Sequence, residues 1–288
     1  MMGDESTALQ RVLRKAGGPE ILDVLAERLS GADLTTLLLE VMRVRARGLT
    51  PADVLRRYTT DRFVGPATVP FERIRRAEDA VLSVVPADFE LLTLAPVAPL
   101  GAHSAPATVD QNKVITTIRN TEVAADPTNA LALEAAVRRR RSTDPVRLAA
   151  FQRVARAQHF AGAGMSAHFG LFALVSGDRD TGNLAFERRH LAEHLSLLTD
   201  AVRACGIPDP EVRVTVLDPR FERVADGVGA TDDSDRQSGR GYYTGLCFKI
   251  YADGVELGDG GFVDWTARLL GNRKERLLIS ALGVDRLS

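Results

Sequence analysis

The sequence predicts an α+β protein in which helices flank an antiparallel sheet, with a helical N-terminal extension before it. Helical periodicity and strand-like runs follow one another as helix, strand, helix, hairpin, helix, strand, hairpin, helix and strand. Hairpins join strands that run in opposite directions, so this order favours an antiparallel sheet with helices packed against it. Regular βαβ alternation and a G-x-G-x-x-G turn after a strand are both missing, which argues against a dinucleotide-binding fold.

Length and composition set the outer bounds of the prediction. The 288 residues are 45% hydrophobic and 26% charged, which is typical of a globular protein with a large core. A formal charge of −1 provides no general attraction to nucleic acid or to an anionic membrane. No run of about 18 apolar residues and no leader is present, so we expect a cytoplasmic protein without a membrane span. Cys205 and Cys247 are expected to be reduced thiols.

Residues 1–66 are predicted to form short helices, and residues 67–288 the main domain. Thr50–Pro51–Ala52–Asp53 places an N-cap before a proline at the first helical position. The run Phe63–Val64–Gly65–Pro66 then interrupts the periodicity and marks the boundary. A broad apolar stripe at helical spacing precedes it, formed by Leu34, Leu37, Leu38, Leu39, Val41, Met42 and Val44.

The first half of the main domain is predicted from periodicity and proline positions. Phe71–Val85 is amphipathic and ends before Pro86, and Phe89–Ala98 is a strand that contains Pro96. Val114–Val123 alternates like a strand, and Asp126–Pro127 begins a helix that runs to about Arg140. The four arginines Arg138–Arg141 lie in its last turn, where we expect a solvated basic end or, as the alternative, a phosphate-binding patch.

The second half contains two hairpins. Predicted strands Val146–Phe160 and His168–Ser176 surround the loop Ala161–Gly164, and a helix at Phe186–Cys205 and a strand at Val212–Leu217 follow. Asp226–Gly241 is rich in Gly, Asp and Ser and is expected to be mobile. The second hairpin turns at Asp253–Gly254, and after it come a glycine-rich bend, a helix and a last buried strand.

Three short patterns near the C-terminus carry a resemblance to a known family. They are Tyr242–Tyr243–Thr244–Gly245, Gly258–Asp259–Gly260–Gly261 and Gly283–Val284–Asp285–Arg286. In this order they resemble the last third of the class II aminoacyl-tRNA synthetase catalytic core. Histidyl-tRNA synthetase and its paralogues without an anticodon-binding domain are the most similar members. The strand, glycine loop and strand around residue 156 are similar to motif 2, and the helix and proline-bearing strand over 71–98 to motif 1, which forms the dimer interface in that family.

The resemblance implies a set of site residues. Arg156 and Arg286 would hold ATP phosphates, and Arg156 also a substrate carboxylate, since the guanidinium fork matches anionic oxygens. Asp126 and Thr128 would hold a substrate amino group, and Tyr243 would line the side-chain pocket. Each residue also has a plain structural interpretation: a surface arginine, an ordinary Asp–Pro helix start, and a packing tyrosine.

Several departures from the family pattern change the expected function. The glutamine and glutamate that recognise histidine align with Gly170 and Leu174, and each lost buried partner costs about 1–3 kcal/mol. Histidine is therefore not the expected ligand. A catalytic arginine aligns with Ser238. Acids of the family align with three further positions, Gly241, Gln158 and Lys249. Each lost preorganised charge would lower turnover by about 10²–10³-fold.

Two functions remain as hypotheses. In the first, a class II synthetase-like protein binds ATP, together with Mg²⁺, and an amino-acid-like carboxylate. If active, it forms an acyl-adenylate for a small molecule or a carrier protein. In the second, it is a catalytically silent regulatory paralogue with a protein partner, similar to the regulatory subunit of ATP phosphoribosyltransferase. The sequence ends soon after Arg286, so we expect no anticodon-binding domain and no tRNA partner. The resemblance implies a homodimer.

A separate pattern, His190–Leu191–Ala192–Glu193–His194, matches the H-x-x-E-H arrangement of some zinc proteases. On a helix both histidines lie on one face and can reach one metal ion. Such a short pattern arises easily by chance, so we predict exposed histidines on an amphipathic helix. The same interpretation applies to His103, His159 and His168.

Overall fold

The structure is a computed structural model that describes residues 3–158 and 166–288, with side chains described from residue 8 onward. The glycine loop Ala161–Gly164 and His159 lie outside the described residues. Contacts divide the chain into two units. One contains Met1–Asp61 and Thr116–Thr121, and the other contains Arg62–Ile115 and Glu122–Ser288.

The smaller unit is helical, with α1 Gly3–Ala16, α2 Glu20–Asp23, a π-helical turn Val24–Arg28, α3 Gly31–Arg47 and α4 Pro51–Thr60. Helix α4 begins as predicted, because Thr50 and Asp53 form a capping box and Pro51 occupies the first helical position. Helices α2, α3 and α4 contain no buried residue. Several residues of the predicted apolar stripe, such as Leu37, Val41 and Val44, are exposed.

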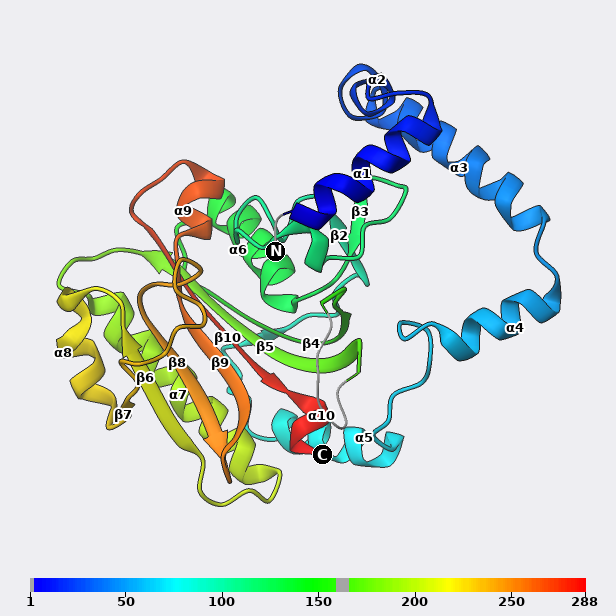
Figure 1. The fold of residues 1–288 in the computed structure, drawn as a ribbon. Coiled ribbons are helices and arrows are strands. Elements are labelled where there is room, and N and C mark those ends of the chain that lie inside the picture. Colours follow the sequence, from blue (N-terminus) through cyan, green and yellow to red (C-terminus); the bar gives the residue numbers. More distant parts are fainter. Residues whose placement is uncertain (1–2, 159–165) are drawn as a thin grey trace. The chain divides into compact units, whose positions relative to one another are not determined.

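The larger unit is built on an eight-stranded sheet, which confirms the predicted fold class (Figure 1). The inner strands β4, β5, β10, β9, β8 and β6 pair antiparallel, and only the edge pairs β1–β4 and β6–β7 are parallel. In spatial order the strands are β1 Glu90–Leu91, β4 Val146–Ala155, β5 His168–Arg179, β10 Glu275–Gly283, β9 Val255–Val263, β8 Thr244–Ala252, β6 Glu211–Val216 and β7 Thr231–Asp232.

Helices cover both faces of this sheet (Figure 1). Helices α5 (Phe71–Leu82) and α7 (Ala185–Ala204) bury their apolar sides in one cluster with Phe172, Leu278 and Leu282. On the opposite face, α6 (Pro127–Arg141) and α9 (Trp265–Leu270) share a cluster with Leu277, Ile279 and Ala281. Consecutive strand residues point to opposite faces, so β10 contributes to both clusters.

Glycines set the spacing of the C-terminal strands. Asp253 and Gly254 both have positive φ, of 48° and 76°, as the predicted two-residue turn between β8 and β9 requires. On β9, a Cβ at Gly260 would approach the Ser280 Cβ to 2.6 Å and the Phe248 ring to 2.5 Å. The glycine-rich run therefore allows three strands to pack closely at their centre.

Two predicted strands differ from the structure. Phe89–Ala98 is split into β1 and β2 (Val97–Pro99), because the segment around Pro96 leaves the sheet. Val114–Val123 forms a strand only at β3 (Thr121–Val123), which pairs with β2. The remaining short elements are the 3₁₀ turns Gln111–Lys113, Pro219–Phe221 and Asp226–Val228, and helices α8 Glu222–Ala225 and α10 Val284–Leu287.

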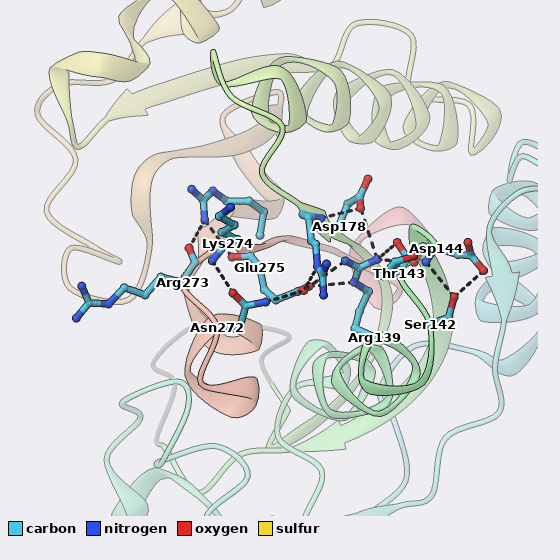
Figure 2. A network of polar contacts seen from close by, with 11 residues as sticks. Arg139, Ser142, Thr143, Asp144, Asp178, Asn272, Arg273, Lys274 and Glu275 are labelled. Carbon is cyan, nitrogen blue, oxygen red and sulfur yellow. Dashed lines mark hydrogen bonds and ion pairs between the residues drawn. The ribbon is translucent and has the colours of Figure 1, made fainter.

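The prediction that the arginines at the end of α6 are solvated is wrong for Arg139. Its side chain is buried and bridges Glu275 of β10, with Nε 2.9 Å from Oε2 (Figure 2). The guanidinium also donates to the carbonyls of Thr143 and Asp144. Helix α6 packs against β5 and β10, so one residue of the four-arginine run necessarily faces inward.

The prediction of exposed histidines on α7 is also wrong. His190 is 2% exposed and His194 is fully buried. The His194 ring lies 2.9 Å from the Ser176 hydroxyl and 2.8 Å from the Ser280 hydroxyl, and His190 is 2.7 Å from Glu193. In residues 3–158 and 166–288, no group of three potential ligands is placed to hold a metal ion. Both histidines therefore pack in the core, and His194 hydrogen-bonds α7 to the sheet, whereas His190 bonds within the helix.

The other described histidines also have hydrogen-bond partners. His103 is buried and lies 2.6 Å from Glu122, and His168 is 2.6 Å from the Gly65 carbonyl. Across the described part of the chain, no helix is both long and apolar enough to cross a membrane.

Candidate functional site

A recess of about 200 Å³ opens between β5, β9, β10 and the start of α10. Six of its residues carry charge: Asp126, Arg156, Glu256, Asp259, Asp285 and Arg286. The sequence prediction named three of them, Asp126, Arg156 and Arg286, and the structure brings these three together.

Asp126 is positioned by the start of α6. As N-cap residue it accepts hydrogen bonds from the Thr128 backbone N–H at 2.9 Å and the Thr128 hydroxyl at 2.7 Å. Its other carboxylate oxygen, Oδ2, lies 3.3 Å from Arg156. Asp126 therefore caps the helix and contributes to the recess at the same time. Thr128 is 3% exposed and lies behind Asp126, so it supports the carboxylate rather than lining the recess.

Arg156 follows the last residue of β4. Its Nε donates to the Ala125 carbonyl at 2.8 Å, and its guanidinium lies 5.1 Å from the centre of the Phe169 ring. Together with the Asp126 contact, these interactions hold the guanidinium plane in one orientation.

Arg286 lies at the opposite wall, in the first turn of α10. It is exposed, and its Nη1 donates to the Glu256 carbonyl at 2.5 Å. The neighbouring Asp285 is engaged elsewhere, because it accepts from the Gly170 N–H at 2.8 Å and from Arg153 at 3.2 Å. Within the described residues, no carboxylate pairs with Arg286.

The third wall of the recess centres on Asp259 of β9. Its Oδ2 accepts from the Tyr243 hydroxyl at 3.1 Å and lies 3.5 Å from Arg236. Desolvation raises the pKa of Asp259 above its ordinary value, and the Arg236 charge opposes that rise. Desolvation also raises the pKa of Tyr243, so its phenol stays protonated and donates to Asp259.

The sequence does not predict two residues of this wall: Asp259, which lines the recess, and Arg236, which lies beside Asp259 without lining it. Arg236 is 7% exposed, donates to the carbonyls of Ser238 and Phe248, and lies 5.7 Å from the centre of the Tyr243 ring. It comes from the segment predicted to be mobile, two residues before the position that aligns with the family's arginine. Asp259 lies in the glycine-rich bend, which the sequence identifies only as part of a fold pattern.

The strand positions expected to face the substrate need a correction. Leu174 is fully buried in the cluster beneath α5 and α7, on the face of β5 opposite Ala173. Gly170 borders the recess, where a Cβ would lie 3.0 Å from the Asp285 carboxylate. The other β5 residues of the recess are Phe169 and Leu171, so this strand offers apolar side chains and no polar partner for an imidazole.

Each carboxylate of the recess already has a cation beside it. Asp126 pairs with Arg156, Asp285 with Arg153, Asp259 with Arg236, and Glu256 with Lys249 at 2.6 Å. Mg²⁺ bound with a nucleotide requires one or two carboxylates that are free to ligate it. A protein-held Mg²⁺ would therefore have to compete with these cations for the recess carboxylates. For ATP itself, Arg286 is the recess cation that has no carboxylate beside it in the described chain and so fits a phosphate.

Comparisons with known proteins support the fold. The sequence matches no protein-family model and no curated protein. Solved structures do match. An ATP phosphoribosyltransferase regulatory subunit/histidyl-tRNA synthetase from Bacillus halodurans is similar with a TM-score of 0.63 at 15% identity, over 78% of this chain and 81% of the other. A histidine–tRNA ligase subunit from Alicyclobacillus acidocaldarius gives 0.59 at 16% identity, over 77% and 96%.

The pyrrolysyl-tRNA synthetase from Desulfitobacterium hafniense is similar with a TM-score of 0.55 at 14% identity, over 81% of this chain and 72% of that chain. At such low identities the likeness concerns the fold. The larger unit therefore has the class II synthetase-like core that the three C-terminal patterns predict, with its recess at the carboxyl end of β10.

Proposed function

We propose that this protein binds an amino-acid-like carboxylate in the recess between Asp126, Arg156 and Arg286, and that it acts by binding rather than by turnover. One observation carries the proposal. Arg286 is the only recess cation without a carboxylate partner in the described chain, while every recess carboxylate has a cation beside it. A ligand carboxylate at Arg286 would balance that charge through two parallel hydrogen bonds.

The rest of the recess suits the amino end of such a ligand. Asp126 presents a carboxylate whose orientation is fixed by the helix cap and by Arg156, and an ammonium group is a natural partner for it. Small-molecule pockets for drug-sized ligands usually exceed about 300 Å³. A volume of about 200 Å³ is therefore matched to something smaller, such as an amino acid.

The charge pairing also favours a silent, regulatory role over catalysis. Arg156 is already bonded to Asp126 and to the Ala125 carbonyl, and Lys249 pairs with Glu256. A nucleotide phosphate at Arg156 would have to share the guanidinium with the Ala125 carbonyl and with Asp126. In a regulatory protein, the bound ligand instead stabilises one conformation and thereby changes the affinity for a protein partner. The similar Bacillus halodurans protein, an ATP phosphoribosyltransferase regulatory subunit/histidyl-tRNA synthetase, is consistent with this role.

A second candidate function rests on the same free guanidinium. Arg286 also suits an ATP phosphate, because a phosphate accepts the same two-pronged hydrogen bonds. In that case a substrate carboxylate oxygen attacks the α-phosphorus and pyrophosphate leaves, producing an acyl-adenylate for a small molecule or a carrier protein. We expect a homodimer in either case.

We expect Arg286→Gln and Asp126→Asn each to weaken binding of the best ligand, found by calorimetry over the common amino acids, about 10-fold or more. Each removes a charge-assisted hydrogen bond, worth about 1.5–3 kcal/mol. Asparagine is as good an N-cap as aspartate, so Asp126→Asn leaves the start of α6 intact. Asp110→Asn, at another N-cap outside the recess, serves as the matched control and should leave binding unchanged.

The same samples separate the two candidate functions. A regulatory binder takes up the amino acid without ATP and supports no amino-acid-dependent exchange of labelled pyrophosphate into ATP. Exchange that Arg286→Gln abolishes would instead establish the adenylating enzyme. Equal affinity of Arg286→Gln, Asp126→Asn and the unmodified protein for every amino acid would overturn the recess as the binding site.

A further inference from the structure

A second, larger recess of about 610 Å³ lies at the other end of the same strands. It is formed by the start of α7, the 3₁₀ turn Pro219–Phe221, the last residues of β9, α9 and the first residues of β10. It shares no residue with the recess around Asp126. On β10, Leu277 near the first residue borders the second recess, and Gly283 at the last residue borders the first.

The walls of the second recess are predominantly apolar, and the residues that line it include Leu184, Phe221, Phe262, Val263 and Leu277. The Phe221 and Phe262 rings lie 5.6 Å apart at 50° and form an aromatic wall. A Cβ at Gly245 would come within 2.3 Å of the Phe221 ring, so the ring depends on the glycine of the Tyr-Tyr-Thr-Gly pattern for its place. This surface suits a flat or compact hydrocarbon body.

One buried polar atom in this recess has no partner. Glu187, in the first turn of α7, is 2% exposed and lines the recess. Its Oε1 accepts from Arg276 Nε at 3.2 Å, but its buried Oε2 has no hydrogen-bond partner. The other Arg276 nitrogens bind elsewhere: Nη1 donates to the carbonyls of Arg273 and Glu275, and Nη2 to Asp180.

Native proteins rarely leave a buried carboxylate oxygen unpaired. An ionised carboxylate has accepting lone pairs only, so the missing partner must be a donor, such as a hydroxyl or an N–H. Desolvation raises the pKa of Glu187, consistent with a carboxylate short of hydrogen bonds. A ligand that donates to Oε2 would supply the missing partner.

The rim contains one available cation. Arg220 pairs with Asp218, and Arg268 donates to the carbonyls of Ala105 and Pro106. By contrast, the Arg273 side chain extends away from the neighbouring polar network, as Figure 2 shows. Arg273 is exposed, and its guanidinium forms no ion pair within residues 3–158 and 166–288. It can therefore hold an anionic group of a ligand that reaches the rim.

We propose that the second recess is a binding site for a small molecule with an apolar, aromatic body, a hydrogen-bond donor that meets Glu187 and an anionic group that meets Arg273. The donor and the anion are at opposite ends of such a molecule, with the ring between them against Phe221 and Phe262. A hydroxyaryl carboxylate has this chemistry.

The test uses 4-hydroxyphenylacetate as the probe and methyl NMR of the full chain labelled at Leu and Val. Titration to about 10 mM covers the weak affinities expected of so small a ligand. We expect shifts of the Leu184, Val263 and Leu277 methyl signals, with Leu171 and Leu257 of the first recess unchanged. Shifts at Leu171 and Leu257 only, or at none of these residues, would overturn the proposal.

Two matched probes examine the two polar groups separately. Phenylacetate lacks the hydroxyl donor, and 2-(4-hydroxyphenyl)ethanol lacks the anion. We expect each to bind about 10-fold more weakly than 4-hydroxyphenylacetate. Glu187→Leu should abolish the advantage of the hydroxyl, and Arg273→Gln that of the carboxylate.

Arg273 is exposed, so Arg273→Gln keeps the proposal testable even where the buried Glu187→Leu change impairs folding. Arg203→Gln, at an exposed position in the last turn of α7, is the control and should leave affinity unchanged. Unchanged affinity in Arg273→Gln, together with equal binding of all three probes, would refute the proposed recognition.

Discussion

Replacing Arg139 by methionine is expected to destabilise the larger unit by about 3–5 kcal/mol, the cost of breaking a buried ion pair. The Arg139 side chain has no accessible surface, and its partner Glu275 is 2% accessible. In the variant, Glu275 keeps only Arg179 at 3.2 Å and Asn272 at 3.4 Å. The carbonyls of Thr143 and Asp144 lose the donor that Figure 2 shows between them. The buried Glu275 carboxylate then has Arg179 as its one remaining ion-pair partner, which is weaker compensation because the Arg179 side chain is 49% exposed.

Chemical unfolding monitored by tryptophan fluorescence measures this effect in the larger unit, because Trp265 is the only tryptophan of the chain and is buried on α9. Arg140→Met is the matched control. Arg140 is the next residue of α6 and is exposed, so its replacement should change the free energy of unfolding by less than about 0.5 kcal/mol. Equal stabilities of the two variants would show that the Arg139–Glu275 pair contributes nothing to the fold.

Arg139 also illustrates why the sequence predicts secondary structure better than it predicts contacts between distant side chains. Four consecutive arginines at a helix end indicate a favourable interaction with the helix dipole, and that interpretation needs no tertiary information. Which of the four faces inward depends on how α6 packs against β5 and β10. Glu275, the residue that neutralises Arg139, lies 136 residues away in sequence. No local pattern connects the two positions.

The local signals worked where backbone chemistry decides the conformation. The two-residue turn at Asp253–Gly254 needs two residues with positive φ, and the capping box at Thr50–Asp53 needs side chains three residues apart. Both features can be recognised from residues that lie close together in the sequence. The expected strand at Val114–Val123 relied on alternation alone, and only Thr121–Val123 forms a strand of the structure.

The candidate site was partly predictable for a similar reason. Asp126, Arg156 and Arg286 stand at ends of elements, where the resemblance to the synthetase core placed them. Arg236 is not predicted by the sequence because it lies in an irregular segment. Two glycines of positive φ there, Gly239 and Gly241, direct the chain back towards Tyr243. The pairing of each recess carboxylate with a cation, on which the proposed function depends, is a property of side-chain positions that no spacing reveals.

The second large effect expected is a loss of stability in mild acid that originates at His194. Desolvation in the core, followed by the charge of nearby His190, lowers the pKa of His194 to about 3. The unfolded chain has the ordinary value near 6.5. A depressed folded-state pKa gives stability that is complete above about pH 6.5 and is lost as the pH falls toward 3, because the unfolded state then binds the additional proton. The loss is about 1.4 kcal/mol per pH unit, or about 2 kcal/mol between pH 6.5 and 5.

His194→Gln isolates this contribution. Glutamine does not titrate, yet its amide can bond both serine hydroxyls that contact the imidazole, Ser176 of β5 and Ser280 of β10. Unfolding in urea at pH 7, 6 and 5 should show the unmodified protein losing about 2 kcal/mol more than the variant. The carboxylate of Glu193 does not contribute to the loss of stability between pH 7 and 5. Hydrogen bonds from Arg147 and Arg189 and the charge of His190 outweigh the desolvation that raises its pKa and hold it at about 2, so its contribution is lost only below about pH 4.5. Parallel stability curves for the two proteins between pH 7 and 5 would mean that His194 is protonated in the folded core, in which case a partner other than the two hydroxyls must stabilise its charge.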